Sequence, residues 1–353
     1  MTIMKVWRVK QANEEQLGSE LREAAAWIRE GGLIAFPTET VYGLGADARS
    51  TAAVERIFSA KGRPSDNPLI VHIAHRKQLD KLVLPYPKLA SALMDRFWPG
   101  PLTIVLPVRD EVLSPLVTAG LSTVGIRVPD HRTALALLEQ ADCPIAAPSA
   151  NRSGRPSPTL AEHVLEDLDG RIDGLVDDGP TGVGLESTVI ELEGELGIRI
   201  LRPGGITREA LQQAVPEARI DSASIEEPET APRSPGMKYA HYAPQGELVL
   251  VQGDPGAVTA YIHTQVDAAS RDGKVTGVLA FEERLADYKA DHVLSLGSEA
   301  ELGAAAHRLY AALRELDRVG AERIWAEGSS EQGIGAALMN RLAKAAGNRI
   351  VRV

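Results

Sequence analysis

Apolar positions alternate between helical spacing and short unbroken runs over the first two hundred residues. Residues 17–30 carry apolar side chains three and four positions apart, and Gly31 and Gly32 end this predicted helix before the apolar run LIAF at 33–36. The alternation predicts further helices at 51–60, 87–97, 132–141 and 159–168, a helix opening at Thr207, and strands at PLIVHI (68–73), LTIVLP (102–107), VGIRVP (124–129), PIAAPSA (144–150), GLVDDG (174–179), STVIEL (187–192) and IRILRPG (198–204). Connections of this mixed kind predict a twisted α/β sheet rather than a purely parallel one.

The pattern changes at about residue 213. Residues 213–245 combine several prolines with a run of acids and show no periodicity, which predicts an extended interdomain linker. The alternation then restarts, with strands predicted at ELVLVQ, VTGVLAF, HVLSL, RIWAEG and RIVRV and helices near 255–270, 300–319 and 333–346. We therefore expect a first α/β domain over residues 1–212, the linker over 213–245, and a smaller, Rossmann-like α/β domain over 246–353.

The composition is that of an ordinary globular protein. Of the 353 residues, 44% are hydrophobic and 24% are charged, and a chain of this length usually divides into two domains. No window approaches the roughly 18 unbroken apolar residues that a membrane span needs, and the N-terminal stretch is too polar for a secretory signal. The single cysteine, Cys143, suits a reducing compartment. We expect a cytoplasmic protein with no membrane contact, in which Cys143 is a small buried side chain.

The net charge of −10 is spread over both halves of the chain. Residues 1–214 hold 23 Lys and Arg against 28 Asp and Glu, and the remainder holds 15 against 20, which argues against a general nucleic-acid binder. Six basic residues nevertheless lie in neutral surroundings rich in glycine and proline: Lys61, Arg63, Arg127, Arg152, Arg155 and Arg202. Such a set of cations is better suited to binding phosphate groups in a pocket than to binding a long nucleic-acid duplex.

Three loops at the ends of predicted strands carry hydroxyl and amide side chains. They are FPTETVYG (36–43), APSANRSGRPSPT (147–159) and GLESTVIE (184–191). α/β proteins build binding sites from such loops, and prolines hold them in place before a ligand arrives. A single residue such as Ser157 could equally belong to an ordinary turn, and Arg127 could simply pair with an acid. Together, the loops and several fixed cations match what a triphosphate requires.

Two familiar nucleotide-binding motifs do not explain the chain. GLGADA (43–48) fits the pattern G-x-G-x-x-A, but no strand directly precedes its first glycine and no acid follows at the end of the next strand. We therefore set dinucleotide binding aside. The pattern G-x-x-x-x-G-K-[ST] does not occur, so the chain is not a P-loop enzyme.

Taken in order, the segments resemble the successive signatures of the YrdC/Sua5 family, the threonylcarbamoyl-AMP synthases. The resemblance is carried by FPTETVYGLG, the K-x-R of KGRPSDNPLIVHI, WPGPLT, the S-x-N of APSANRSGRPSPT, ESTVI and LRPG. SPGMKYAHYAP and the C-terminal GIGAALMNRLAKAA resemble the longer Sua5 type. The resemblance implies the family's twisted mixed sheet with a deep concave groove over residues 1 to about 212, followed by the smaller C-terminal domain.

The same resemblance implies an activity and a set of site residues. The family makes L-threonylcarbamoyl-AMP from L-threonine, bicarbonate and ATP and releases pyrophosphate. A tRNA threonylcarbamoyltransferase then modifies the adenosine beside the anticodon of ANN-decoding tRNAs. Carried over by position, the ATP-binding residues are Lys61, Arg63, Asn67, Thr123, Ser149, Asn151, Ser157, Arg202 and Tyr239. The threonine-binding residues are Thr40, His72, Arg127, the backbone at Ala147, and Ser187.

The chemistry of these residue types fits such a reaction. The substrate's own carbamate oxygen attacks the α-phosphorus, so the protein needs no nucleophile and has to position the reactants and neutralise charge, with Mg²⁺ on the phosphates. Lys61, Arg63 and Arg202 are the catalytic candidates for that task, and no residue is assigned to the metal. Arg127 suits the amino-acid carboxylate, while His72 with Thr40 or Ser187 suits the side-chain hydroxyl.

The linker could close the site. We expect Tyr239, and with less support His241 or Tyr242, to fold over the nucleotide groove. The alternative is a strap that only joins the two domains.

Two other functions stay open from the sequence. One is an RNA-binding module for tRNA or double-stranded RNA, against which the overall acidity weighs. The other is a carbamoyltransferase on a related YrdC domain, as in hydrogenase-maturation factors. Those proteins carry zinc-finger and acylphosphatase modules, for which this chain has neither the cysteines nor the length.

Overall fold

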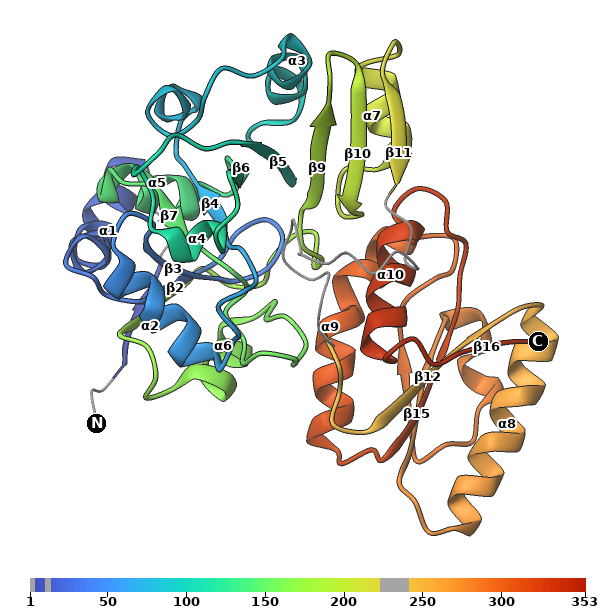
Figure 1. Cartoon of the computed structure of the whole chain (residues 1–353). Coiled ribbons are helices and arrows are strands. Elements are labelled where there is room, and N and C mark those ends of the chain that lie inside the picture. Colours follow the sequence, from blue (N-terminus) through green and yellow to red (C-terminus); the bar gives the residue numbers. More distant parts are fainter. Residues whose placement is uncertain (1–3, 10–13, 223–240) are drawn as a thin grey trace. The chain divides into compact units, whose positions relative to one another are not determined.

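The computed structural model describes residues 4–9, 14–222 and 241–353, which fall into two compact units (Figure 1). Of the described residues, the first unit takes those up to Ser153, 158–182 and 186–222. The second takes Gly154–Ser157, Val183–Leu185 and 241–353. No helix in the described ranges combines the length and the apolar character that a membrane crossing requires.

The strands described in the first unit form one mixed sheet of eleven members, ordered β1-β8-β2-β3-β7-β4-β6-β5-β9-β10-β11. In chain order they are β1 (Lys5–Arg8), β2 (Ile34–Phe36), β3 (Gly43–Asp47), β4 (Ile70–His72), β5 (Leu102–Pro107), β6 (Thr123–Arg127), β7 (Ile145–Ala146), β8 (Gly174–Asp177), β9 (Thr188–Glu193), β10 (Gly197–Arg202) and β11 (Arg219–Ser222). The pair β4–β6 is parallel and the pair β5–β6 is antiparallel. The predicted mixed α/β sheet is confirmed.

Helices surround the sheet of this unit, and the ends of α2 (Thr51–Lys61) show how side-chain capping and glycine set the helix boundaries. They are α1 (Glu14–Arg29), α2 (Thr51–Lys61), the short 3₁₀ helix η1 (Arg76–Lys81), α3 (Lys88–Phe97), α4 (Pro115–Thr118), α5 (Arg132–Ala141), α6 (Ala161–Leu168) and α7 (Arg208–Ala214). The Ser50 hydroxyl accepts from the backbone N–H of Ala53 at the start of α2, and Gly62 ends the helix with a φ of 61°. Lys61 is therefore the last helical residue, and Arg63 belongs to the loop that follows.

Helices cover both faces of the sheet. α1 and α5 lie side by side (Figure 1) and share one hydrophobic cluster with Ile34 and Phe36 of β2. Ala35, between them in sequence, belongs to the other cluster, together with Val54 and Ile57 of α2. Successive residues of a strand point to opposite faces, so a strand covered on both sides is apolar throughout. This explains the unbroken run LIAF.

The sequence pattern does not predict β1 or β3. β3 contains the glycines of GLGADA and pairs antiparallel with β2 and β7. A Cβ at Gly45 would lie 2.7 Å from the Phe36 ring and 2.9 Å from a methyl group of Ile145. The glycine therefore allows neighbouring strands to carry large side chains, and it does not form a phosphate-binding turn.

The first ten residues of the predicted linker are part of the first unit. α7 continues to Ala214, and β11 pairs in parallel with β10. The pattern missed β11 because a strand of four residues with one buried side chain carries little periodic signal. Residues 223–240 lie outside the described residues.

The second unit is built on a parallel sheet. Its described strands follow the order β14-β13-β15-β12-β16, and each pairs in parallel with its neighbours. Its elements are β12 (Glu247–Gln252), α8 (Pro255–Arg271), β13 (Thr276–Ala280), the 3₁₀ helix η2 (Glu282–Asp287), β14 (His292–Ser295), α9 (Leu302–Arg318), β15 (Arg323–Glu327), α10 (Gly335–Ala345) and β16 (Ile350–Arg352). α8 packs on β12, β13 and β15, whereas α9 packs on β14, α10 packs on β12, and these two helices also pack on each other. The predicted smaller, Rossmann-like α/β domain is confirmed.

A short segment from the middle of the chain is part of this second unit. The backbone N–H of Ala243 donates to the Gly154 carbonyl at 2.8 Å, and Arg314 on α9 donates to the Pro156 carbonyl at 2.7 Å. Arg155 pairs with Asp317, also on α9, at 3.7 Å. The second unit is therefore assembled from separate stretches of chain.

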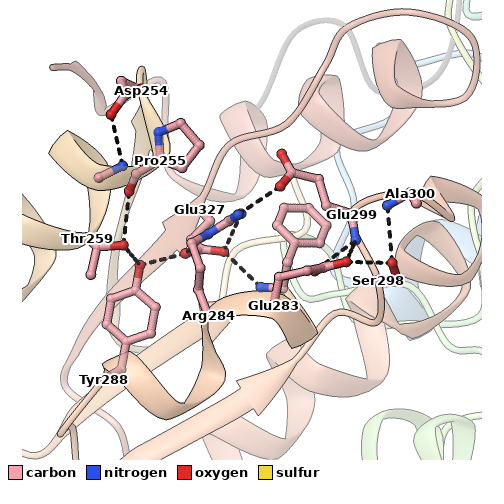
Figure 2. Close-up of polar contacts among 12 residues, drawn as sticks. Asp254, Pro255, Thr259, Glu283, Arg284, Tyr288, Ser298, Glu299, Ala300 and Glu327 are labelled. Atoms are coloured by element: carbon pink, nitrogen blue, oxygen red, sulfur yellow. Dashed lines mark hydrogen bonds and ion pairs between the residues drawn. The ribbon is translucent and has the colours of Figure 1, made fainter.

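A buried carboxylate, Glu327, organises one end of the parallel sheet. Figure 2 shows Arg284, Tyr288 and Glu327 pointing toward one another. Glu327 accepts hydrogen bonds from the backbone N–H of Phe281 at 2.8 Å, from Arg284 at 2.8 and 3.0 Å, and from the Tyr288 hydroxyl at 2.5 Å. Both oxygens are used, and Arg284 also donates to Glu299 at 2.8 Å. The network ties the ends of β13 and β15 to η2.

We expect Glu327→Gln to destabilise the second unit by about 3 kcal/mol, because removing one partner leaves Arg284 in a partly buried site without its main counter-charge. Amide hydrogen exchange in β13 and β15 measures this change. The control is Glu315→Gln, which removes a partly exposed partner of the exposed Arg318 and should cost less than about 1 kcal/mol. Equal protection in both variants would contradict the role given to Glu327.

Candidate active site

Two of the predicted threonine-binding residues lie on adjacent strands. His72 ends β4 and Arg127 ends β6, and the two residues stand opposite each other in the parallel register. Both are buried. Burial, and then the charge of Arg127, lower the pKa of His72 to about 3, so its imidazole is neutral at physiological pH.

Arg127 is held by the loop that follows β2. One terminal nitrogen donates to the Thr40 hydroxyl at 3.0 Å, and the other forms a buried ion pair with Glu39. The Thr38 and Thr40 hydroxyls lie 2.7 Å apart. Arg127 therefore does pair with an acid, as the sequence left open. It also lies beside Thr40 and His72, as the site prediction requires.

Several polar atoms in this group have no hydrogen-bond partner within the described residues, although they are buried. They are Glu39 Oε1, His72 Nδ1 and Arg127 Nε. A buried polar atom without a partner costs about 1–3 kcal/mol, so native proteins keep few of them. Three in one ion-paired cluster indicate a place where a polar ligand completes the hydrogen bonding.

Ser187 and Arg202 form a second group. The Arg202 guanidinium donates to the Ser187 carbonyl at 3.0 and 3.1 Å and to its hydroxyl at 3.2 Å. The Ser187 hydroxyl is also 2.8 Å from that of Thr103 on β5. Arg202 ends β10 and Ser187 directly precedes β9, so the antiparallel pairing of these strands brings the two residues together.

Lys61 connects α2 to the loop after β7. Its ammonium group donates to the carbonyl oxygens of Ser149 and Asn151, both at 2.6 Å. Burial, and then the nearby Arg63, lower the pKa of Lys61 well below its ordinary value, with Asp167 acting in the opposite direction. A protonated ammonium has three N–H groups, so one remains after the two carbonyls.

The loop that Lys61 contacts runs beside β3. The Leu44 N–H donates to the Pro148 carbonyl at 2.7 Å, and the Ala150 N–H donates to the Tyr42 carbonyl at 2.8 Å. The Ala147 N–H donates to the Ile70 carbonyl on β4 at 3.0 Å. Backbone hydrogen bonds to two strands therefore position Ala147, Ser149 and Asn151, which the sequence assigns to both substrates.

Asn67 is the most unusual side chain of the predicted ATP set. It is fully buried, and neither its amide oxygen nor its amide nitrogen has a hydrogen-bond partner among the described residues. Its own carbonyl, with that of Pro68, accepts from Arg63 at 3.4 and 3.2 Å. Arg63 and Asn67 are thus adjacent, as the K-x-R segment suggested.

The remaining predicted site residues are Thr123, Ser157, Tyr239, His241 and Tyr242. Thr123 starts β6 and is half-buried. Ser157 is buried but belongs to the second unit. Tyr239 lies outside the described residues, so the lid stays a prediction. His241 and Tyr242 are buried in the second unit, where the Tyr242 ring lies 5.3 Å from that of Tyr310 and 5.5 Å from the Arg341 guanidinium carbon.

The sequence reasoning missed Glu39 and Thr103. Glu39 stands inside the quoted loop FPTETVYG, and the signal for it was available, because an arginine within an apolar strand calls for a buried acid. Cys143 is buried as predicted, and burial raises the pKa of its thiol to about 12, which leaves it unreactive.

Comparisons with known proteins agree with the motif series. Residues 26–204 match a family model described as "Telomere recombination", Sua5_yciO_yrdC, and residues 206–347 match one described as "Threonylcarbamoyl-AMP synthase, C-terminal domain". The threonylcarbamoyl-AMP synthase of Bacillus subtilis is 51% identical over 333 residues, which are 94% of each chain. That of Halorhodospira halophila is 38% identical over 183 residues, 52% of this chain and 94% of the relative.

A crystal structure of Pyrococcus abyssi Sua5 complexed with L-threonine has the same fold over the full length. It superposes with a TM-score of 0.91 at 46% identity and covers 100% of both chains. The chain therefore belongs to the YrdC/Sua5 family of threonylcarbamoyl-AMP synthases, in its long Sua5 form with a C-terminal domain.

Proposed function

We propose that this protein makes L-threonylcarbamoyl-AMP from L-threonine, bicarbonate and ATP and releases pyrophosphate. The product would serve threonylcarbamoylation of the anticodon-adjacent adenosine of tRNA by a partner transferase in the cytoplasm. Membership of the family supports the reaction. The structural observation that carries it is a set of buried polar atoms that have no hydrogen-bond partner within the described part of the chain. They belong to Asn67, His72, Arg127 and Glu39, in a unit that also buries the cations Lys61 and Arg202.

The nucleotide would be bound by fixed cations and amides. Lys61 has one ammonium N–H beyond its two carbonyl partners, and Asn67 offers both a donor and an acceptor. These groups suit the oxygens of a triphosphate, and Arg63 and Arg202 add charge. Thr123, Ser149 and Asn151 complete the proposed ATP set within the first unit. Because these are cations, hydroxyls and amides, we propose Mg²⁺ as part of the MgATP substrate and assign no residue to it.

The reaction requires positioning more than covalent catalysis. The threonine ammonium group first loses a proton. The free amine then attacks the carbon of bicarbonate, so that a C–N bond forms, a C–O bond breaks and water leaves, which gives a carbamate. One carbamate oxygen then attacks the α-phosphorus while the bond to pyrophosphate breaks. Charge grows on the phosphoryl and pyrophosphate oxygens, and Lys61, Arg63 and Arg202 would stabilise it. These side chains are already held by backbone carbonyls, so little reorganisation accompanies the reaction.

The amino acid would bind between the ends of β4, β6 and β9. Arg127 suits its carboxylate, because each terminal nitrogen has a second N–H beyond the bond it makes to Thr40 or Glu39. A neutral His72 with Thr40 or Ser187 suits the hydroxyl of threonine. An amino acid without a hydroxyl would leave these buried groups unpaired and would be rejected.

We expect pyrophosphate release from ATP and Mg²⁺ to require both L-threonine and bicarbonate. Lys61→Ala or Arg63→Ala should lower the rate about 100-fold, because each removes a cation directed at developing charge. The matched control is Lys88→Ala, an exposed lysine on α3, which should leave the rate unchanged. Release that ignores threonine and bicarbonate would contradict the proposed reaction.

ATP binding should weaken as the pH rises through the lowered pKa of Lys61. Burial and Arg63 lower the pKa of Lys61 in the free protein, whereas a bound triphosphate raises it. Affinity is therefore complete below the pKa of the free protein and falls up to tenfold per pH unit above it, until the pKa of the complex is reached. Titration calorimetry at a series of pH values below the ordinary lysine pKa measures this slope. Lys61→Arg keeps its charge throughout and should show no slope, and a flat wild-type profile would refute the assignment.

Asn67→Leu should raise the stability of the free protein and weaken ATP binding. It removes a buried amide without partners, so the free energy of unfolding of the free protein should rise by about 1 kcal/mol, while ATP affinity falls. Asn151→Leu is the contrasting variant, because the Asn151 amide accepts from the Ser149 hydroxyl at 2.5 Å and donates to the Arg152 carbonyl at 2.8 Å. It should lower stability. Urea unfolding without ligand distinguishes the two variants. If Asn67→Leu were destabilised, the Asn67 amide would have hydrogen-bond partners in the free protein, which would contradict the interpretation.

A further inference from the structure

Glu39 is a buried carboxylate in which one of the two oxygens has no hydrogen-bond partner among the described residues. It lies in the loop after β2, and its Oε2 pairs with Arg127. Its Oε1 is buried and has no hydrogen-bond partner among the described residues. A buried carboxylate oxygen of this kind raises the free energy of the folded state, because it has lost its hydrogen bonds to water and has no protein donor in their place.

The same chain shows what a purely structural buried carboxylate looks like. Glu327 is also buried, and its two oxygens accept four hydrogen bonds from Phe281, Arg284 and Tyr288. If Glu39 served only as a counter-ion to Arg127, we would expect both of its oxygens to accept hydrogen bonds as well.

The groups near Glu39 do not fully neutralise its charge, so a further cation would be stabilised beside it. Arg127 already shares its charge with Glu39, and it must also serve the substrate carboxylate in the proposed function. His131 is close enough for Glu39 to raise its pKa. Burial has the larger effect and lowers that pKa overall, so His131 is neutral at pH 7.5. Neither group therefore supplies a full positive charge to Oε1.

An amino-acid zwitterion has the complementary pattern. Its carboxylate needs a cation, and its ammonium, two bonds away, needs an anion. The pair of Arg127 and Glu39 presents these two charges side by side, and both members have a buried atom without a partner. We propose that Glu39 binds the α-ammonium group of the amino-acid substrate through Oε1 while Arg127 binds the carboxylate.

This assignment rests on the proposed function and adds a residue to it. Glu39 selects substrates with an α-amino group and fixes the nitrogen that is to be carboxylated. The role is one of binding and orientation, and no proton transfer is assigned to Glu39. Carboxylic acids that have the β-hydroxyl but no amine would bind through Arg127 and through His72 with Thr40 or Ser187, without a contact to Glu39.

The test compares two ligands in two proteins. L-Threonine and (R)-3-hydroxybutyrate share the carboxylate and the hydroxyl, but only threonine has the ammonium group. We expect Glu39→Gln to weaken L-threonine binding about 10- to 100-fold, the range for a lost hydrogen bond to a charged group. The Kd of (R)-3-hydroxybutyrate should change less than about threefold. Both constants are measured by NMR titration of the full chain, with ATP binding as the check on folding.

Each other outcome overturns the inference. Equal weakening of both ligands would mean that Glu39 only positions Arg127, and unchanged threonine binding would mean that Oε1 does not meet the ammonium. Glu39→Asp, which keeps the charge, should recover part of the lost threonine affinity. Failure of the proposed function would be visible separately, because the wild-type protein would then release pyrophosphate without requiring threonine.

Discussion

The site depends on how charged side chains are kept inside the first unit. Lys61, Arg127 and Arg202 are all buried, and a buried charge is tolerated only when dipoles or opposite charges surround it. Backbone carbonyls perform this task for Lys61 and Arg202, and Glu39 performs it for Arg127. Beyond these supports, Lys61 keeps one ammonium N–H, and Arg127 keeps a second N–H on each terminal nitrogen. Fixed cations with donors to spare are what an anionic substrate requires.

The sheet explains why these supports are available. Strands of both directions meet at β4, β6 and β7, so the loops after β2 and β7 return to the same region. Their backbone groups then satisfy side chains that are distant in sequence. Lys61 reaches Ser149 across 88 positions, and Arg127 reaches Glu39 across a similar span. No local propensity encodes such contacts, and they arise only when the sheet forms.

The sequence predicted the mixed sheet, the second α/β domain and the grouping of His72 with Arg127 and Thr40. Periodicity and strand-end chemistry carry that information. It could not show which buried atoms lack partners, because that depends on the exact register of strands far apart in the chain. Asn67 and Glu39 are the examples, since both are ordinary loop residues until their surroundings are known. β3 was missed because its glycines resemble a turn, although they serve close packing.

The segment Gly154–Ser157 has a consequence for how the chain can be divided. It packs with α9 through Arg314 and Asp317, yet in sequence it lies between stretches of the first unit. No single scissile bond therefore separates the units cleanly. A protease that cuts between residues 223 and 240 would leave two fragments that still associate, because α9 retains its hold on a loop from the other fragment. Such a nicked protein would keep its apparent mass in size-exclusion chromatography until a denaturant is added.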